Sequence, residues 1–415
     1  MKSIGIIGGG IIGLSSAYYL AKAGHKVTVL DKGSLDEGCS FGNAGMIVPS
    51  HFIPLAAPGM IAKGIRWMFN AESPFYVKPR LDRALLRWGY LFYKSATKEN
   101  VARAIPALKE LSLLSKSIYR DWSKELPFDF GYCERGLIML YKTAEIEHEE
   151  QATAHLASRY GMEAKILSPD EVQALEPDVR VDVKGGVYFP GDAHLVPRQL
   201  VEQLIKFLRG QGVHFAGNTE VTDFRTDRGG IASVETTHGA FSFDEVVLAT
   251  GSWSGKLGRQ LGLDLPMQAG KGYSFTLEAV PRNIRVPSIF VEARVAVTPM
   301  GNSLRFGGTM EIAGINHDIN MNRVGGIVKS IPSYYPDMKV NIPSREATWH
   351  GLRPCSPDGL PYIGRAKAIN NLIVATGHAM LGLSLGPATG RIVSDLVASQ
   401  RPIMNIAAFD PGRFE

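Results

Sequence analysis

The stretch that decides the fold is residues 4–32, "IGIIGGGIIGLSSAYYLAKAGHKVTVLDK". Its first four residues form an apolar run suited to a buried parallel strand, and the next six fit G-x-G-x-x-G. A helix over about residues 11–23 and a second strand over 27–30 follow, and Asp31 ends that strand. This order predicts a βαβ unit that holds a dinucleotide, with the pyrophosphate at the helix N-terminus and a ribose diol on Asp31. A βαβ unit that binds nothing is the alternative, and the placement of Asp31 argues against it.

Composition narrows the class of protein. A length of 415 residues predicts two or three domains, and 45% apolar with 20% charged residues is ordinary for a globular protein. No uninterrupted apolar run of ~18 residues occurs, so no membrane span is predicted. The net charge of +5 is mild and does not indicate a nucleic-acid partner.

The cysteines point to a reducing compartment. Cys39, Cys133 and Cys355 are odd in number and far apart. Their spacing excludes a disulfide framework and a C-x-x-C metal site, and no metal ligands are assigned. We therefore expect a cytoplasmic protein.

The rest of the chain contains segments unlike the opening βαβ unit, followed by a C-terminal segment that returns to its pattern. Residues 57–95 read as irregular, helical periodicity covers 105–122, and a strand is predicted over 136–141. Ser168 followed by Glu171 predicts a capping box. A helix is expected from Pro197 to about Gly210, and residues 265–350 alternate like an antiparallel sheet. Residues 370–399 return to a buried strand, a glycine loop and a helix.

The expected fold class is therefore mixed α/β, with a domain assembled from separated segments. Residues 1–85, 192–262 and 345–415 are predicted to form a discontinuous Rossmann-like dinucleotide-binding domain. Residues 86–191 and 263–344 are predicted to form an inserted antiparallel-sheet domain for the substrate.

Several longer motifs carry a family resemblance. They are "SFGNAGMIVPSHFIPLAAPG" (40–59), "VVLATGSWS" (246–254), "KGYSFTL" (271–277), "GLRPCSPDGLPYIG" (351–364) and "NLIVATGHAMLGLSLGPATGRIVSDL" (371–396). With the opening stretch, they make the chain resemble the FAD-dependent D-amino-acid oxidase/glycine oxidase superfamily over nearly its whole length. The first of these motifs favours the bacterial D-amino-acid dehydrogenases within that superfamily.

The resemblance implies an extended, non-covalently bound FAD. The second and third glycine-rich segments also indicate a group larger than NAD. The resemblance places the adenine ribose at Asp31, the pyrophosphate at residues 8–13 and the flavin ring near residues 43–46 and the C-terminal loop. The implied cofactor-binding residues are Gly8, Gly10, Ile11, Ile12, Gly13, Asp31, Lys32, Ser40, Asn43, Ala44, Gly45, Met46, Val221, Thr250, Gly251, Gly382 and Leu383.

Two of these residues have a predicted electronic role. A helix starting near Leu383 would aim its positive end, and the amides of Gly382 and Leu383, at the flavin C2 carbonyl. An ordinary packed helix is the alternative. Cys355 is interpreted as a small buried thiol and not as a covalent flavin attachment.

Two residues are predicted to bind the substrate. The resemblance places Arg353 where related enzymes hold the substrate carboxylate, and its planar guanidinium matches two carboxylate oxygens. The alternative is a surface arginine beside Pro354. Tyr273 is predicted to donate to the same carboxylate, with a half-buried strand tyrosine as the alternative. His51 and His350 are given no catalytic role.

The implied reaction is oxidative deamination of a D-amino acid to a 2-oxo acid and ammonia through an imino acid. Electrons would pass to a quinone or another non-oxygen acceptor. A peroxide-forming D-amino-acid or glycine-type oxidase and a D-proline or D-hydroxyproline dehydrogenase remain alternatives. A non-catalytic flavoprotein is disfavoured by the Arg353 motif. Neither the preferred amino acid nor the oligomeric state follows from the sequence.

A quinone acceptor predicts peripheral contact with the inner face of a membrane. Residues 60–94 mix aromatic side chains with cations, as interfacial segments do. The alternative is a loop whose aromatic side chains pack on the protein. The residues concerned are Trp67, Phe69, Phe75, Tyr76, Trp88 and Tyr90, with Lys63, Arg66, Lys78, Arg80, Arg83 and Arg87.

Overall fold

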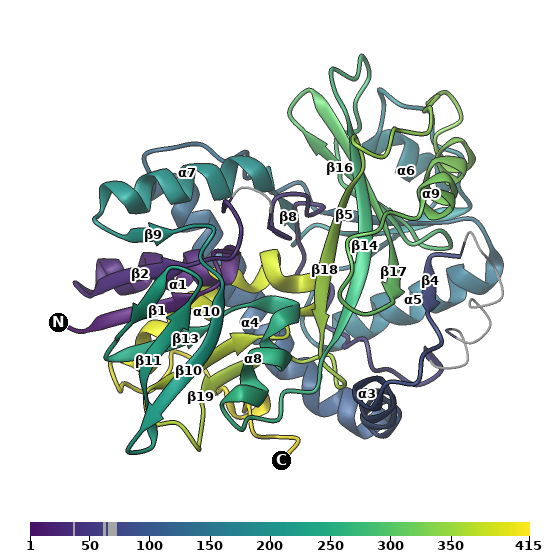
Figure 1. The fold of residues 1–415 in the computed structure, drawn as a ribbon. Helices are drawn as coiled ribbons and strands as arrows, with labels where there is room; N and C mark the ends of the chain where they lie inside the picture. The colour runs from purple at the N-terminus through teal and green to yellow at the C-terminus, as the bar shows by residue number, and fades with distance from the viewer. Residues whose placement is uncertain (36–37, 61–63, 65–72) are drawn as a thin grey trace.

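The predicted parallel sheet is present and is built from distant parts of the chain. The computed structural model describes residues 1–35, 38–60, 64 and 73–415. Six strands pair in the order β19-β20-β13-β1-β2-β9, all parallel except β19 (Figure 1). Their bounds are β1 (Ser3–Ile7), β2 (Lys26–Leu30), β9 (His214–Ala216), β13 (Glu245–Leu248), β19 (Tyr362–Arg365) and β20 (Leu372–Thr376).

Helices and a small sheet complete this body. One apolar core joins the parallel sheet to α1 (Ile11–Lys22), α4 (Lys98–Glu125), α7 (Pro197–Gly210) and α10 (Gly382–Val397). A second core joins it to α8 (Ser254–Gln260) and to a three-stranded antiparallel sheet of β10 (Val221–Asp227), β11 (Gly230–Thr236) and β12 (Gly239–Phe241). Among the helices within the described ranges, none is both long and apolar enough to cross a bilayer.

A mostly antiparallel sheet of nine strands forms the other body, on the right of Figure 1. The order is β18-β14-β17-β16-β15-β5-β7-β6, and β4 pairs with β17. Helix α9 (Met321–Tyr334) packs on this sheet, with α5 (Ala144–Arg159) and α6 (Pro169–Leu175) beside it. The strands are β4 (Phe75–Val77), β5 (Leu137–Tyr141), β6 (Lys165–Leu167), β7 (Gly185–Phe189), β14 (Gln268–Leu277), β15 (Ser288–Phe290), β16 (Val295–Met300), β17 (Ser303–Ile312) and β18 (Trp349–Cys355).

The expected fold class is confirmed, and local signals account for most helix bounds. The capping box of α6 is present, because Ser168 accepts from the Glu171 amide and Glu171 accepts from the Ser168 amide. The prediction that residues 57–95 are irregular is wrong for the end of this segment, where α3 spans Arg83–Ser95. The Asp82 side chain caps α3 by accepting from the Ala84 amide at 2.9 Å.

Three of the described elements pack in a different body from the one to which the predicted domain boundaries assign them. Helix α4, inside residues 86–191, shares the core of the parallel sheet. Strands β4 and β18, inside residues 1–85 and 345–415, pair within the nine-stranded sheet. Contacts between segments far apart in the sequence decide the placement of these elements, and a local sequence pattern does not reveal such contacts.

Candidate functional site

The glycine turn after β1 is built for close backbone approach. Gly8 has φ +107°, and a Cβ there would lie 2.4 Å from the Ala249 carbonyl oxygen. A Cβ on Gly13 would lie 1.9 Å from the Gly8 carbonyl oxygen. Gly10 caps α1 without any side-chain hydrogen bond. The turn therefore excludes side chains and leaves the positive end of α1 for an anionic group.

Asp31 lies beside this turn, as predicted from the sequence. Its carboxylate accepts from the Gly9 amide at 2.6 Å and from the Gly33 amide at 2.8 Å. Its carbonyl accepts from the Thr219 amide at 2.7 Å, which brings the chain leading to Val221 against the end of β2. The next residue, Lys32, places its Nζ 3.6 Å from the centre of the Trp253 ring.

The segment around residues 40–48 runs from α1 to the substrate sheet. Ser40 Oγ accepts from the Ile11 amide at 3.0 Å, and Asn43 Oδ1 accepts from the Gly45 amide at 2.9 Å. Arg305 of β17 donates to the Asn43 carbonyl at 2.9 Å. Residues 46–47 then form β3, which pairs with β8 (Ala193–His194). Ala44 and its neighbours therefore lie where the two bodies meet.

The two later glycine segments come to the same region. Thr250 Oγ1 lies 2.9 Å from Ser254 Oγ, and the Gly251 carbonyl accepts from Thr376 Oγ1 at 3.2 Å. Helix α10 begins at Gly382, after a 3₁₀ turn over Ala379–Leu381, and no side chain caps it.

The first turn of α10 is held against segment 40–48. Ser384 Oγ accepts from the Val48 amide at 3.0 Å, and the Leu383 carbonyl accepts from the Tyr119 hydroxyl at 2.7 Å. The N-terminus of α10 thus adjoins the segment that was predicted to lie along a flavin ring.

The Arg353 guanidinium lies against Gly272 of β14, where no side chain competes for the space. On β18 Arg353 pairs with Gly270 of β14, so both residues face the same side of the sheet. A Cβ on Gly272 would lie 2.2 Å from Arg353 Nη1, and the guanidinium therefore occupies that space. Burial lowers the pKa of Arg353 below its usual value. Sequence reasoning missed Gly272, although glycines at alternate strand positions signal a close approach.

A bulge in β17 supplies the other contact of this arginine. The register between β14 and β17 shifts opposite Gly272, and Thr309 has φ +67° there. The Thr309 carbonyl accepts from Arg353 Nη1 at 2.7 Å. Within the described residues, no carboxylate pairs with Arg353. A neutral oxygen thus positions the guanidinium without cancelling its charge, which leaves that charge for an anionic ligand.

Tyr273 does not join Arg353. It pairs with His350 and lies three residues from Gly270, so its side chain points to the opposite face of the sheet, toward α9. The phenol donates to Glu311 Oε2 at 3.1 Å and accepts from the Asn320 amide at 3.2 Å. Burial, above all, raises its pKa. This geometry corrects the expectation that both residues hold one carboxylate.

A buried charge cluster that the sequence analysis did not anticipate lies on that opposite face. Glu311 sits between Lys271 Nζ at 3.6 Å and Arg323 Nε at 3.5 Å, and all three are at least nine-tenths buried. Lys271 also donates to Asn316 and to the Asp318 carbonyl. A lysine within an otherwise uncharged strand was the available signal. The cluster ties the loop after β17 to the sheet.

The wall beside Arg353 is apolar. Trp88, Met310, Ile312 and Cys355 form one buried cluster, which we call the α3 cluster. Burial raises the pKa of the Cys355 thiol to about 11, so it is a neutral, inert group near pH 7. In the portion of the chain that the structure describes, no group of His, Cys, Asp and Glu could hold a metal ion.

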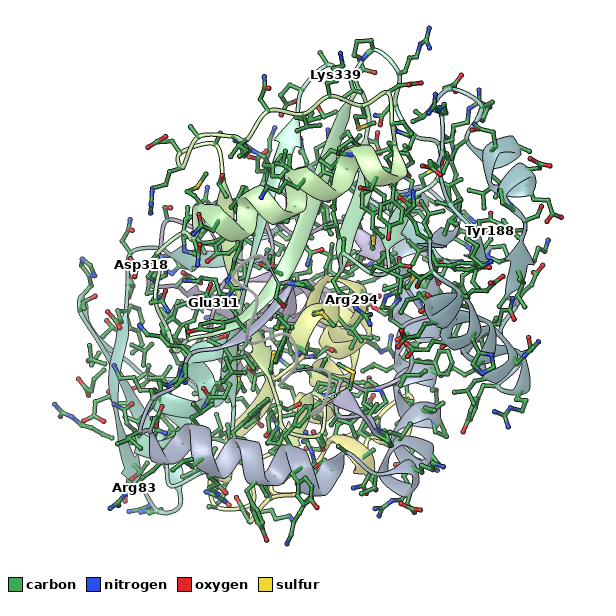
Figure 2. All side chains as sticks on the ribbon, turned by 90° about the vertical axis from the view of Figure 1, so that its right-hand side faces the viewer. Arg83, Tyr188, Arg294, Glu311, Asp318 and Lys339 are labelled. Atoms are coloured by element: carbon green, nitrogen blue, oxygen red, sulfur yellow. The ribbon has the colours of Figure 1, made fainter. Side chains whose placement is uncertain are left out.

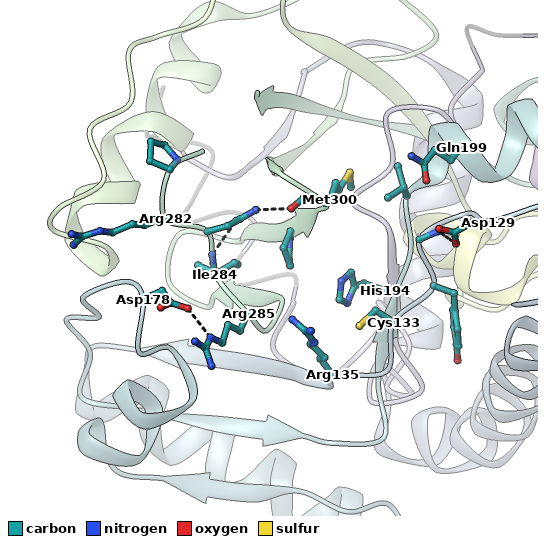
Figure 3. Close-up of a pocket in the computed structure, with 17 residues that line it drawn as sticks. Asp129, Cys133, Arg135, Asp178, His194, Gln199, Arg282, Ile284, Arg285 and Met300 are labelled. Carbon is teal, nitrogen blue, oxygen red and sulfur yellow. Dashed lines mark hydrogen bonds and ion pairs between the residues drawn. The ribbon is translucent and has the colours of Figure 1, made fainter. Parts of the chain in front are cut away.

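A separate cavity of about 690 Å³ lies between the start of α7, the loop at residues 281–285 and the end of β16 with Gly301 after it (Figure 3). Its described lining contains none of the predicted site residues. His194 lines it and pairs through its backbone with Met46. Burial lowers the pKa of His194 to about 4, with a smaller effect of Arg135.

Comparison with known proteins agrees with this geometry. Residues 3–396 match the model of the family described as FAD dependent oxidoreductase. A D-amino acid dehydrogenase of Granulibacter bethesdensis is 33% identical over 420 residues, covering 99% of each chain. Glycine oxidase from Geobacillus kaustophilus is 26% identical with a TM-score of 0.79, over 100% of this chain and 99% of that one. L-proline dehydrogenase from P. horikoshii shares the fold, at 20% identity and a TM-score of 0.78, over 100% and 97%.

The chain belongs to the FAD-dependent oxidoreductase family. It is therefore an enzyme, and its cofactor is FAD. The residues present fit this cofactor: the turn at Gly8 and Gly13 admits no side chain, and the N-terminus of α10 carries no side-chain cap. At the start of α1, Gly10 supplies no cap of its own, and the Ser40 hydroxyl accepts from the Ile11 amide. The turn and the two helix N-termini are each a place for a negatively charged or electron-rich part of the dinucleotide.

Proposed function

We propose that the enzyme oxidatively deaminates D-amino acids to 2-oxo acids and ammonia, and passes the electrons to a quinone or another non-oxygen acceptor. The observation that carries the proposal is the Arg353 guanidinium, which is fixed by the Thr309 carbonyl and, among the described residues, meets no carboxylate. Such a group binds a substrate carboxylate through two parallel hydrogen bonds. The substrate class comes from the relative that is named D-amino acid dehydrogenase.

The glycine turn and Asp31 would hold the pyrophosphate and the adenine ribose, while residues 43–46 and the start of α10 would hold the ring. FAD would supply the hydride-accepting chemistry for oxidation at the substrate Cα. The residues of this chain contribute orientation and electrostatics. Arg353 grips the carboxylate and directs Cα, and the amides at the start of α10 stabilise negative charge that develops nearby. Water then releases ammonia from the imino acid.

The test is an anaerobic screen of the purified enzyme against matched D- and L-amino acids, which follows loss of flavin absorbance. We expect bleaching by D-amino acids, dye-linked turnover in air and little peroxide. If only L-amino acids bleach the flavin, the proposed substrate class is wrong.

An oxidase on the same fold is the second candidate, because glycine oxidase is among the similar structures. Stoichiometric peroxide formation with D-alanine or glycine would favour it over the dehydrogenase. A D-proline or D-hydroxyproline preference remains compatible with the same arginine, since these substrates also carry a carboxylate, and the same panel distinguishes it.

A further inference from the structure

Helix α3 exposes a row of large apolar side chains. Leu86, Tyr90 and Tyr93 stand at positions i, i+4 and i+7, so they share one face of the helix. Their exposed fractions are 64%, 56% and 68%, and Leu81, just before the helix, is fully exposed. A contiguous apolar surface of this kind on a folded protein marks a contact site.

The same segment carries a concentrated positive charge. Residues 78–98 hold six cations and one acid, a net charge of +5, which equals the formal net charge of the whole chain. Arg83 and Lys94 lie three and four residues from Leu86 and Tyr90, respectively, so they flank the apolar row. Figure 2 shows α3 along the lower edge of the molecule with Arg83 near one end.

The structure reduces the set of residues that were predicted to contact a membrane. Trp88 is buried, while Arg87 pairs with Asp264 and Arg80 donates to Gln268 at 2.6 Å, so these three anchor the segment to the protein. Phe75 and Tyr76 are half-buried. Four others, Lys63, Arg66, Trp67 and Phe69, lie outside the described residues.

The buried face of α3 adjoins the substrate site. Trp88 Nε1 donates to the Cys355 carbonyl at 2.9 Å, two residues from Arg353. Ala379, in the turn before α10, packs against the same α3 cluster. One helix thus lies between the exposed apolar row and the wall of the site.

We propose that the exposed face of α3 docks on an anionic lipid bilayer, lying in its interface without crossing it. An apolar row flanked by cations fits the boundary between acyl chains and anionic headgroups. A second copy of the chain fits less well, because two segments of net charge +5 would face each other. The inference rests on the proposed function in that a lipid-dissolved quinone would accept the electrons.

The test is co-sedimentation of the FAD-loaded full-length enzyme, without substrate, with phosphatidylcholine vesicles that do or do not contain phosphatidylglycerol. We expect binding that needs phosphatidylglycerol and falls at least tenfold in 1 M salt. The triple variant Leu86→Ser, Tyr90→Ser, Tyr93→Ser and the double variant Arg83→Glu, Lys94→Glu should each lose binding at least tenfold. Both should keep dye-linked activity, because these side chains are exposed.

The matched control changes three exposed apolar residues elsewhere, Leu113, Ile166 and Ile342, to serine, and it should sediment like the wild type. The proposal fails if the wild type does not sediment, or if the α3 triple variant sediments equally well. It also fails if the wild type is an oligomer that this variant dissociates, since the face would then join two copies. Absence of D-amino-acid turnover would refute the proposed function and leave the sedimentation result standing.

Discussion

Replacing Gly272 by alanine should dislodge Arg353 without unfolding the protein. The added Cβ would lie 2.2 Å, 2.3 Å and 2.4 Å from Nη1, Nη2 and Cζ of Arg353. These atoms form the far end of a flexible side chain, so the arginine can move while β14 stays paired. To reach ordinary van der Waals contact, the guanidinium must retreat by roughly 1 Å, and a misplacement of that size can lower a rate by ~10²-fold.

We therefore expect kcat/KM for the D-amino acid to fall by about 100-fold, equivalent to ~2.7 kcal/mol of transition-state stabilisation. The flavin absorbance and the thermal midpoint should stay close to those of the wild type. The assay is dye-linked turnover over a range of substrate concentrations, with flavin content measured on the same samples.

A matched glycine in the same body serves as the control. In α9, an added Cβ on Gly325 would meet only Ile342 Cδ1, at 3.8 Å, so Gly325→Ala should keep kcat/KM and stabilise the helix slightly. If Gly272→Ala keeps wild-type kcat/KM with flavin bound, Arg353 does not hold the substrate in the seat described above.

The remaining predictions concern the same arginine, the cofactor and a buried acid. Arg353→Lys replaces a fork by a point charge, so kcat/KM should fall by on the order of 100-fold or more, ~3 kcal/mol, with flavin retained; unchanged kinetics would remove Arg353 from the site. Heat or acid should release all FAD into the supernatant, and yellow precipitate would contradict non-covalent binding. Asp192 accepts from the Ser50 hydroxyl and amide, and burial raises its pKa to about 7. Because its unfolded pKa is about 3.9, ionisation of this carboxyl lowers the free energy of unfolding progressively as pH rises from about 4 to 7. Asp192→Asn should therefore gain stability relative to the wild type across that range in urea titrations, and a pH-independent difference would refute the assignment.

The nucleotide half of the site was predictable because its signals are local. Each signal can be recognised within a short stretch of sequence: the glycine spacing, the acid after β2 and the helix that starts at Gly382. The substrate half was predictable only in part. The motif around Arg353 indicated the residue, but its seat over Gly272 and its hydrogen bond to Thr309 depend on pairing between strands far apart in sequence.

By itself, then, the sequence determined a discontinuous dinucleotide-binding sheet, its turn chemistry and the identity of the candidate carboxylate-binding arginine. Only the tertiary structure decided which side chains share a face. Strand side chains alternate between the two faces, so the register of β18 on β14 sends Arg353 to one side and Tyr273 to the other. Tertiary packing also decided the two sides of α3, since Trp88 and Tyr90 are both aromatic but only Trp88 meets a core that can bury it.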